Sequence, residues 1–131
     1  MRDRIRTFAY FGPKLRGLIW FVYAAVWTTS LLTPQPAQIL RRALHKEQAH
    51  YASKSLHVLA SAAFAILTGW LRVLLRWRPW LLVFLSLHAL STEYLQHFVP
   101  ERTPSWTDVG WDHVGIALGI LLSWGWWTKA S

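Results

Sequence analysis

Seven polar residues have the types and the spacing to do chemistry, and they border the most apolar parts of the chain. They are Lys54, His57, Glu93, Gln96, Arg102, Asp108 and Asp112. Residues three or four positions apart share one face of a helix, and Lys54 with His57, then Glu93 with Gln96, have this spacing. Carboxylates beside amino, imidazole and guanidinium groups suit either general acid–base catalysis or the binding of an anion such as a phosphate.

The composition favours a membrane protein with a single domain over residues 1–131. The chain is 53% hydrophobic and contains ten Trp, which is more apolar surface than so small a soluble domain can bury. Its formal net charge is +8, and we interpret it as loop charge that faces anionic lipid, with no nucleic-acid partner. The absence of Cys excludes disulfides and thiolate chemistry.

Four apolar stretches predict an all-α protein, a bundle of four transmembrane helices. They cover residues 17–33, 56–75, 80–99 and 109–127. About 20 residues are needed to cross a bilayer, with a lower limit near 17, so the first stretch is at the limit. The basic start of the chain also resembles a secretory signal. No small-residue cleavage site follows it, and we expect the first stretch to remain as a helix.

Lysine and arginine counts predict that both termini are cytoplasmic. Four crossings place nine basic residues on the face of the termini and five on the other face, and basic loops stay in the cytoplasm. Seven Trp fall on the terminal face, as an interfacial belt would: Trp20, Trp70, Trp77, Trp80, Trp124, Trp126 and Trp127. Between the first two stretches, Ile39, Leu40, Ala43 and Leu44 recur at helical spacing. They indicate either an amphipathic helix on the outer membrane surface or a solvated connector.

This topology brings six of these polar residues, which come from three helix ends, to one depth near the outer face. An ionised carboxylate inside a span is costly, so Glu93 needs a partner, and Arg102 or Lys54 is within reach. Such a cluster is either a structural lock between helices or a functional site. Gly115 and Gly119 form a stripe on which a neighbouring helix can pack closely.

Histidines raise the question of metals and cofactors. His57, His97 and His113, with Glu93 and Asp112, are ligand types for zinc, but nothing fixes their spacing across helices, and we expect no metal. His88 lies in the middle of a span, where we expect a hydrogen-bonded core residue, not a ligand of a cofactor.

These residues resemble the motifs of the VanZ-like family of small bacterial membrane proteins. "SKSLH" contains Lys54 and His57, "EYLQHFVPER" contains the Glu, Gln, Pro and Arg of a second motif, and "DHVGIALG" carries the glycine stripe. Ser53 and Asp112 stand where the family pattern has aspartate and asparagine. The resemblance implies a multi-pass protein of the bacterial inner membrane and cell envelope, and an association with resistance to the glycopeptide teicoplanin.

Three functions stay open. The first is an outward-facing polar pocket that binds an anionic headgroup or a lipid-linked precursor through Lys54, His57 and Arg102, which Glu93 and Asp108 orient. The second is a membrane enzyme on such a substrate, with Glu93 or His57 as general base. The third is a small accessory subunit of a larger membrane complex.

Overall fold

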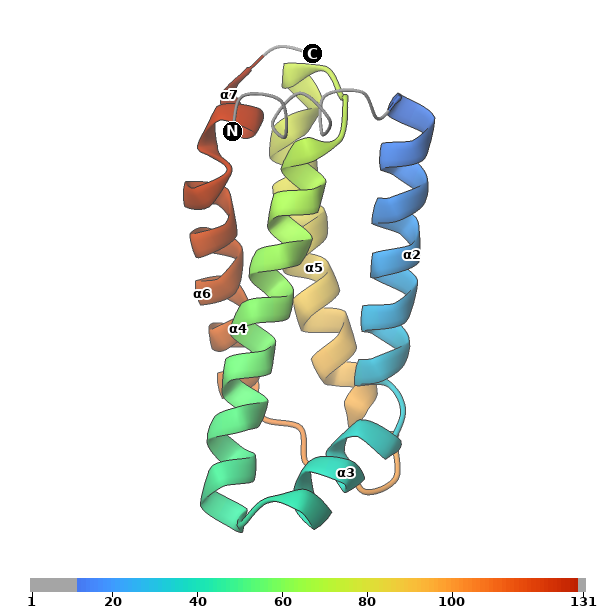
Figure 1. The fold of residues 1–131 in the computed structure, drawn as a ribbon, viewed down its shortest axis with the longest axis vertical. Helices are drawn as coiled ribbons and strands as arrows, with labels where there is room; N and C mark the ends of the chain where they lie inside the picture. Colours follow the sequence, from blue (N-terminus) through green and yellow to red (C-terminus); the bar gives the residue numbers. More distant parts are fainter. Residues whose placement is uncertain (1–11, 130–131) are drawn as a thin grey trace, which may run out of the picture.

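The computed structural model describes residues 12–129, and that part of the chain is helical without strands (Figure 1). The basic residues Arg2, Arg4 and Arg6 lie outside the described residues. The helices are α2 (Pro13–Leu31), α3 (Gln35–Ala43), α4 (Lys46–Trp70), the single-turn η1 (Leu75–Trp77), α5 (Arg78–Gln96), α6 (Trp106–Leu122) and α7 (Trp124–Thr128). The predicted all-α class is therefore confirmed.

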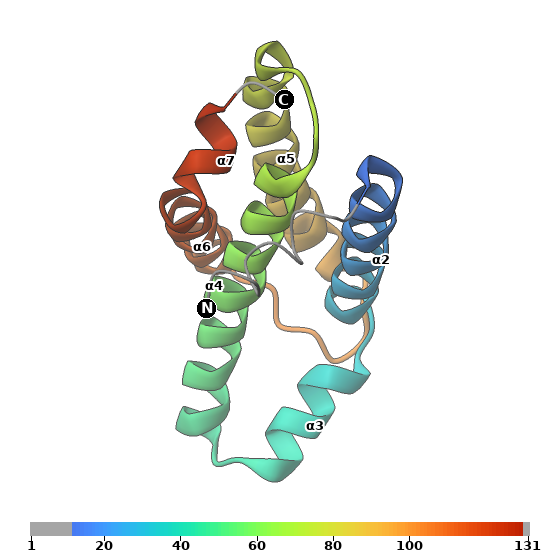
Figure 2. The ribbon, with the colours of Figure 1, turned by 45° about the horizontal axis from the view of Figure 1, so that its top comes forward.

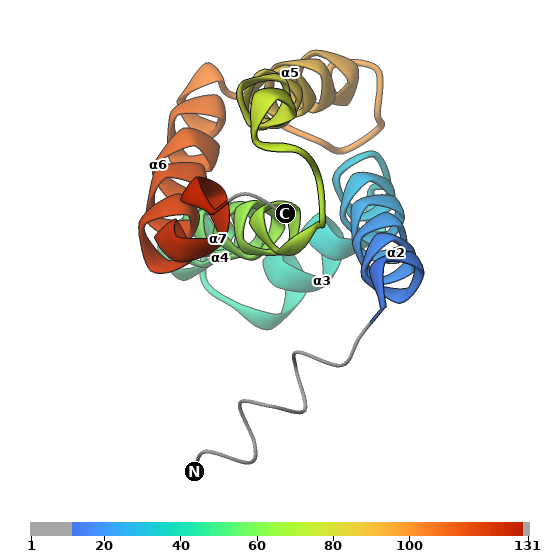
Figure 3. The ribbon, with the colours of Figure 1, turned by 90° about the horizontal axis from the view of Figure 1, so that it is seen from above.

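The four long helices α2, α4, α5 and α6 run up and down beside one another (Figures 1 and 3). One end of the molecule, here the α7 end, holds the start of α2, the end of α4, the start of α5 and α7. The opposite end, here the α3 end, holds α3, which lies across the bundle, and the loop that joins α5 to α6 (Figure 2).

The glycine stripe is what lets α6 approach α4. A Cβ atom on Gly115 would lie 2.3 Å from the carbonyl oxygen of Val58, and one on Gly119 would lie 2.3 Å from that of Ala62. Only hydrogen fits in these positions, so the two backbones touch along the stripe. The close packing predicted for Gly115 and Gly119 is confirmed, and its partner is α4.

The buried core lies toward the α7 end. Phe64 and Ala65 of α4 pack with Leu85 of α5 and Trp127 of α7, and Trp20 of α2 covers the same cluster. Trp20 also donates a hydrogen bond from Nε1 to Thr68 Oγ1 at 2.8 Å.

The seven predicted belt tryptophans all lie on helices or turns at the α7 end, but they do not share one role. Trp77, Trp80, Trp124 and Trp126 are exposed, as an interfacial belt requires, whereas Trp70 and Trp127 are buried and pack inside the protein.

Three helix boundaries differ from the prediction by five residues or more, and one of them is the end of the second long helix, which lies at Trp70 and not at residue 75. The second long helix begins at Lys46, not at residue 56, because His45 and Gln48 form a capping box and Glu47 suits the first turn. The fourth ends at Leu122, and the chain turns at Ser123 before α7. The segment between the first two long helices does form a helix, α3, with Ile39 exposed.

Length and composition alone single out no helix as a membrane span among the described residues. One pair passes that test together, Pro13–Leu31 with Pro36–Ala43, although the two parts meet at an angle of 61°.

Candidate functional site

Five of the predicted polar residues meet between α4, α5 and α6 near the α3 end. Lys54 of α4 forms an ion pair with Asp108 of α6. One turn further along both helices, the Nδ1 atom of His57 lies 2.9 Å from Asp112 Oδ1. The two pairs are linked, because His57 Nε2 lies 3.8 Å from Asp108 Oδ2. The i,i+3 and i,i+4 spacings seen in the sequence therefore place two ion pairs one above the other.

This cluster is almost completely buried. His57, Asp108 and Asp112 are each 6% exposed or less, and Glu93 is 1% exposed. Asp112 also accepts a hydrogen bond from Ser61 Oγ at 2.8 Å, so its carboxylate has two partners on α4. The ring of Trp27 stands edge-on to the His57 ring, with 5.9 Å between the ring centres, and covers it on the α2 side.

Glu93 has a partner other than the expected one. Its Oε1 accepts a hydrogen bond from the backbone N–H of Ser105, at 2.5 Å. No ion pair joins Glu93 to Arg102 or Lys54, so the predicted direct pairing of these side chains is wrong. A backbone donor suffices here, because Ser105 is the N-cap of α6, where free N–H groups favour a negative charge.

Arg102 instead closes the C-terminal end of α2. Its guanidinium donates to the carbonyl oxygens of Thr33, at 2.9 Å, and of Ser30. The side-chain amide of Gln96 donates to the carbonyl of Leu31 at 3.0 Å. These carbonyls have no partner inside the helix, so the "QHFVPER" motif fastens α5 to the end of α2.

The turn that carries Arg102 has an unusual backbone. Glu101 adopts a φ of 63°, in the left-handed region that residues other than glycine seldom occupy. Gln38 donates to its carboxylate and Arg41 to its carbonyl, and both belong to α3. Helix α3 thereby holds the turn in the conformation that directs Arg102 toward α2.

The charge state of Arg102 follows from its surroundings. Burial lowers the pKa of the guanidinium, and the nearby Arg41 lowers it further, whereas the negative charges of Glu93 and Asp108 act in the opposite direction. An arginine pKa starts so high that the group stays cationic at neutral pH. Arg102 thus belongs to the electrostatics of the cluster without touching a carboxylate.

The other histidines stand apart from the cluster. The Nε2 atom of His88 lies 2.8 Å from Thr28 Oγ1, which fits the expected hydrogen-bonded core residue. His113 lies 2.7 Å from Ser86 Oγ through Nε2, and His97 contacts the carbonyls of its own helix. No group of three or more His, Asp or Glu among residues 12–129 is arranged to hold a metal ion.

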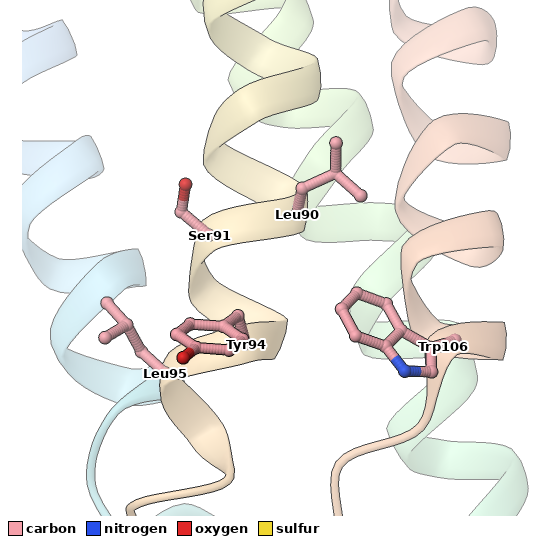
Figure 4. Close-up of a pocket in the computed structure, with 5 residues that line it drawn as sticks. All are labelled: Leu90, Ser91, Tyr94, Leu95 and Trp106. Atoms are coloured by element: carbon pink, nitrogen blue, oxygen red, sulfur yellow. The ribbon is translucent and has the colours of Figure 1, made fainter.

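An open apolar groove lies on the outer surface of α5 and the start of α6. It encloses about 520 Å³ and is lined by Leu90, Ser91, Tyr94 and Leu95 of α5 and by Trp106 on the first turn of α6 (Figure 4). Trp106 follows Ser105 directly, so one wall of the groove is the residue next to the one whose backbone N–H binds the Glu93 carboxylate.

Reasoning from the sequence missed the groups that complete the cluster. The backbone N–H of Ser105 and the carbonyls of Ser30 and Thr33 carry no side-chain signature. Ser61 was also missed, and it bridges α4 and α6 by donating to the carboxylate of Asp112. Its position four residues after His57, on the same helix face, was the available signal.

Comparison with known proteins identifies a family for this chain. No curated protein and no solved structure matches the chain. The model of the VanZ/LLP1 family matches residues 15–127, which include all of α3 to α6, α2 apart from its first two residues, and every residue of the cluster. The chain therefore belongs to the VanZ/LLP1 family, as its motifs indicated.

Proposed function

We propose that this protein is a multi-pass protein of the bacterial cytoplasmic membrane whose cluster at the α3 end binds an anionic headgroup or a lipid-linked envelope precursor. The observation that carries the proposal is the burial of Glu93, His57 and Asp112 together at a junction of helices. Ionisable groups buried in a membrane bundle are costly and mark functional sites by default. In this family we connect such a site with the response of the envelope to glycopeptides such as teicoplanin.

The outer surface of the bundle supports a membrane location. Large apolar side chains face outward on all four long helices, including Phe21 of α2 (65% exposed), Leu59 of α4 (66%), Leu87 of α5 (54%) and Leu122 of α6 (78%). Soluble monomers rarely expose contiguous apolar surface of this kind. In a bilayer these side chains would contact lipid, with the α3 end on the outer face and the α7 end in the cytoplasm.

The chemistry of the α3 end suits an amphiphilic anion. Lys54 and Arg102 supply cationic donors, and the side chain of Lys54 is 16% exposed, so it is the most accessible member of the Lys54–Asp108 pair. An arriving phosphate would compete with Asp108 for Lys54. The apolar groove beside Trp106 would accept the hydrocarbon part of the same molecule.

Photocrosslinking tests this function. Purified protein in neutral detergent is mixed with a polyisoprenyl phosphate that carries a diazirine near its phosphate, and the labelled peptide is mapped by mass spectrometry. We expect label between residues 90 and 106, and less of it for Trp106→Ala than for Trp124→Ala. Trp124 is the control, since it is equally exposed, at 58%, but lies at the α7 end. Label confined to the α7 end, or none, would overturn the proposal.

Two further experiments test the alternative functions, a membrane enzyme and an accessory subunit. Turnover of the lipid phosphate that is lost in Glu93→Gln would make the protein an enzyme. Recovery in mild detergent in a fixed ratio with other membrane proteins, without lipid phosphate bound, would make it an accessory subunit and overturn the binding proposal.

A further inference from the structure

A second group of cationic side chains lies at the α7 end, at the far end of the bundle from the cluster. They surround a cavity of about 290 Å³ that is lined by Arg16 of α2, Arg72 and Arg78 around the α4–α5 turn, and Lys129 after α7. Trp70 and Trp126 form part of its wall. No acidic side chain of residues 12–129 lines this cavity.

Arg78 is built into the wall of the cavity. It is 6% exposed, and its terminal nitrogens donate to the carbonyls of Gly69, at 2.9 Å, and Leu71, at 3.1 Å. Its guanidinium also lies over the ring of Trp127, 5.6 Å from the ring centre. The Nε atom is buried and has no acceptor among the described residues. A buried donor of this kind is rare and is normally satisfied by a ligand, an ion or water.

Helix capping accounts for only part of this charge. The unpaired carbonyls at the end of α4 carry roughly half a negative charge. Arg78 donates to the carbonyl of Gly69, and Arg16 donates to that of Trp70 at 3.0 Å, so two cations already balance this charge. Arg72 and Lys129 add two further cations without an acidic neighbour in the wall. Burial and the charge of Arg72 both lower the pKa of Arg16.

We propose that this cavity binds a phosphate group, which the side chains of Arg72 and Lys129 hold while the buried guanidinium of Arg78 adds its positive charge to the wall. Arginine presents paired N–H donors that fit phosphate oxygens, and lysine adds a mobile positive charge. Basic pockets between helices at the cytoplasmic side of membrane proteins bind anionic lipid headgroups by the same chemistry. The phosphate is therefore either that of a lipid headgroup or free phosphate.

The test is a titration of the purified full chain in neutral detergent with three probes: dioctanoyl phosphatidylglycerol, dioctanoyl phosphatidylcholine and inorganic phosphate. We expect saturable binding of phosphatidylglycerol or of inorganic phosphate, or of both, by calorimetry or native mass spectrometry. Phosphatidylglycerol alone would identify a lipid headgroup as the source, and inorganic phosphate alone would identify free phosphate. The double variant Arg72→Gln/Lys129→Gln should weaken binding about tenfold or more, since each basic residue near an anionic group contributes roughly fivefold.

Control variants show whether the phosphate binds at the α7 end or at the α3 end. Arg76→Gln is the control, because Arg76 is an exposed cation of the same turn that does not line the cavity. Arg72 and Lys129 are also exposed, so their substitution should leave the fold intact, which melting curves check. Equal affinities for Arg76→Gln and the double variant, loss of binding only in Arg102→Gln, or equally tight binding of phosphatidylcholine would overturn the proposal.

Discussion

The carbonyl oxygen of Val58 lies so close to Gly115 that a Cβ atom on this glycine would come within 2.3 Å of it. This close approach of α4 and α6 lies immediately beside the cluster. It therefore determines how Lys54 and His57 of α4 reach the carboxylates of α6. Helices brought together by small residues have their backbones in contact, so any side chain at this position must push them apart.

Gly115→Ala should therefore destabilise the protein by about 1–3 kcal/mol, the usual range for overpacking, although alanine favours a helix over glycine. Gly110→Ala is the matched control, since a Cβ atom there has nothing within 4 Å and lies on the same helix. That substitution should leave the stability unchanged or raise it. Thermal unfolding in detergent compares the two, and equal melting temperatures would show that α6 does not touch α4 at Gly115.

Substitutions of Lys54 and Asp108 should have coupled effects on the free energy of unfolding. The effects of substituting Glu93 and Arg102 should be much closer to additive. Lys54→Met alone leaves the Asp108 carboxylate buried without its cation, which costs on the order of 1–3 kcal/mol, and the double variant Lys54→Met/Asp108→Leu should recover part of this loss. Two double-mutant cycles on the free energy of unfolding give the comparison. A larger coupling for Glu93 with Arg102 would contradict the hydrogen bonds described for Ser105 and Thr33.

The sequence predicted which side chains gather at one end of the bundle, but not which of them pair. Lys54, His57, Asp108 and Asp112 were expected together because helical spacing and an antiparallel fold require it. The partner of Glu93 was predicted wrongly because opposite charge was the only signal available, while the donor is the Ser105 N–H, which any residue would supply. The conformation of the turn at Glu101 could not be predicted either, since its partners Gln38 and Arg41 lie some sixty residues away in the chain.

Asp112→Asn should be well tolerated, and Asp112→Leu should not. Asparagine keeps an oxygen that accepts from Ser61, and it is the residue that the motif of VanZ-like proteins has at this position. Leucine removes the acceptor of both Ser61 and His57 and leaves buried polar groups unpaired, which costs about 1–3 kcal/mol for each group. Chemical denaturation measures both variants, and a leucine variant as stable as the asparagine variant would show that these contacts contribute nothing.

Arg102→Lys should lose most of the stabilisation that Arg102 gives to the C-terminal end of α2. The guanidinium reaches the carbonyls of Ser30 and Thr33 at once through two nitrogens, a geometry that a single ammonium group cannot reproduce. We expect Arg102→Lys and Arg102→Met to loosen the end of α2, detected as faster amide hydrogen exchange around residues 30–33. Arg42→Met is the control, an exposed cation on α3. Unchanged amide exchange in the Arg102 variants would show that this side chain does not bind the end of α2.

The last prediction concerns the orientation of the protein in the membrane, and the count of nine against five basic residues predicts a cytoplasmic α7 end. The chain has no Cys, so a single introduced cysteine reports one position without background. Thr103→Cys lies in the exposed loop at the α3 end, and Thr128→Cys is exposed at the α7 end. In intact cells, a maleimide that cannot cross the membrane should label position 103 and reach position 128 only after the membrane is permeabilised. The reverse pattern would place the α7 end outside, and labelling of both positions in intact cells would rule out an arrangement with the two ends on opposite faces of a bilayer.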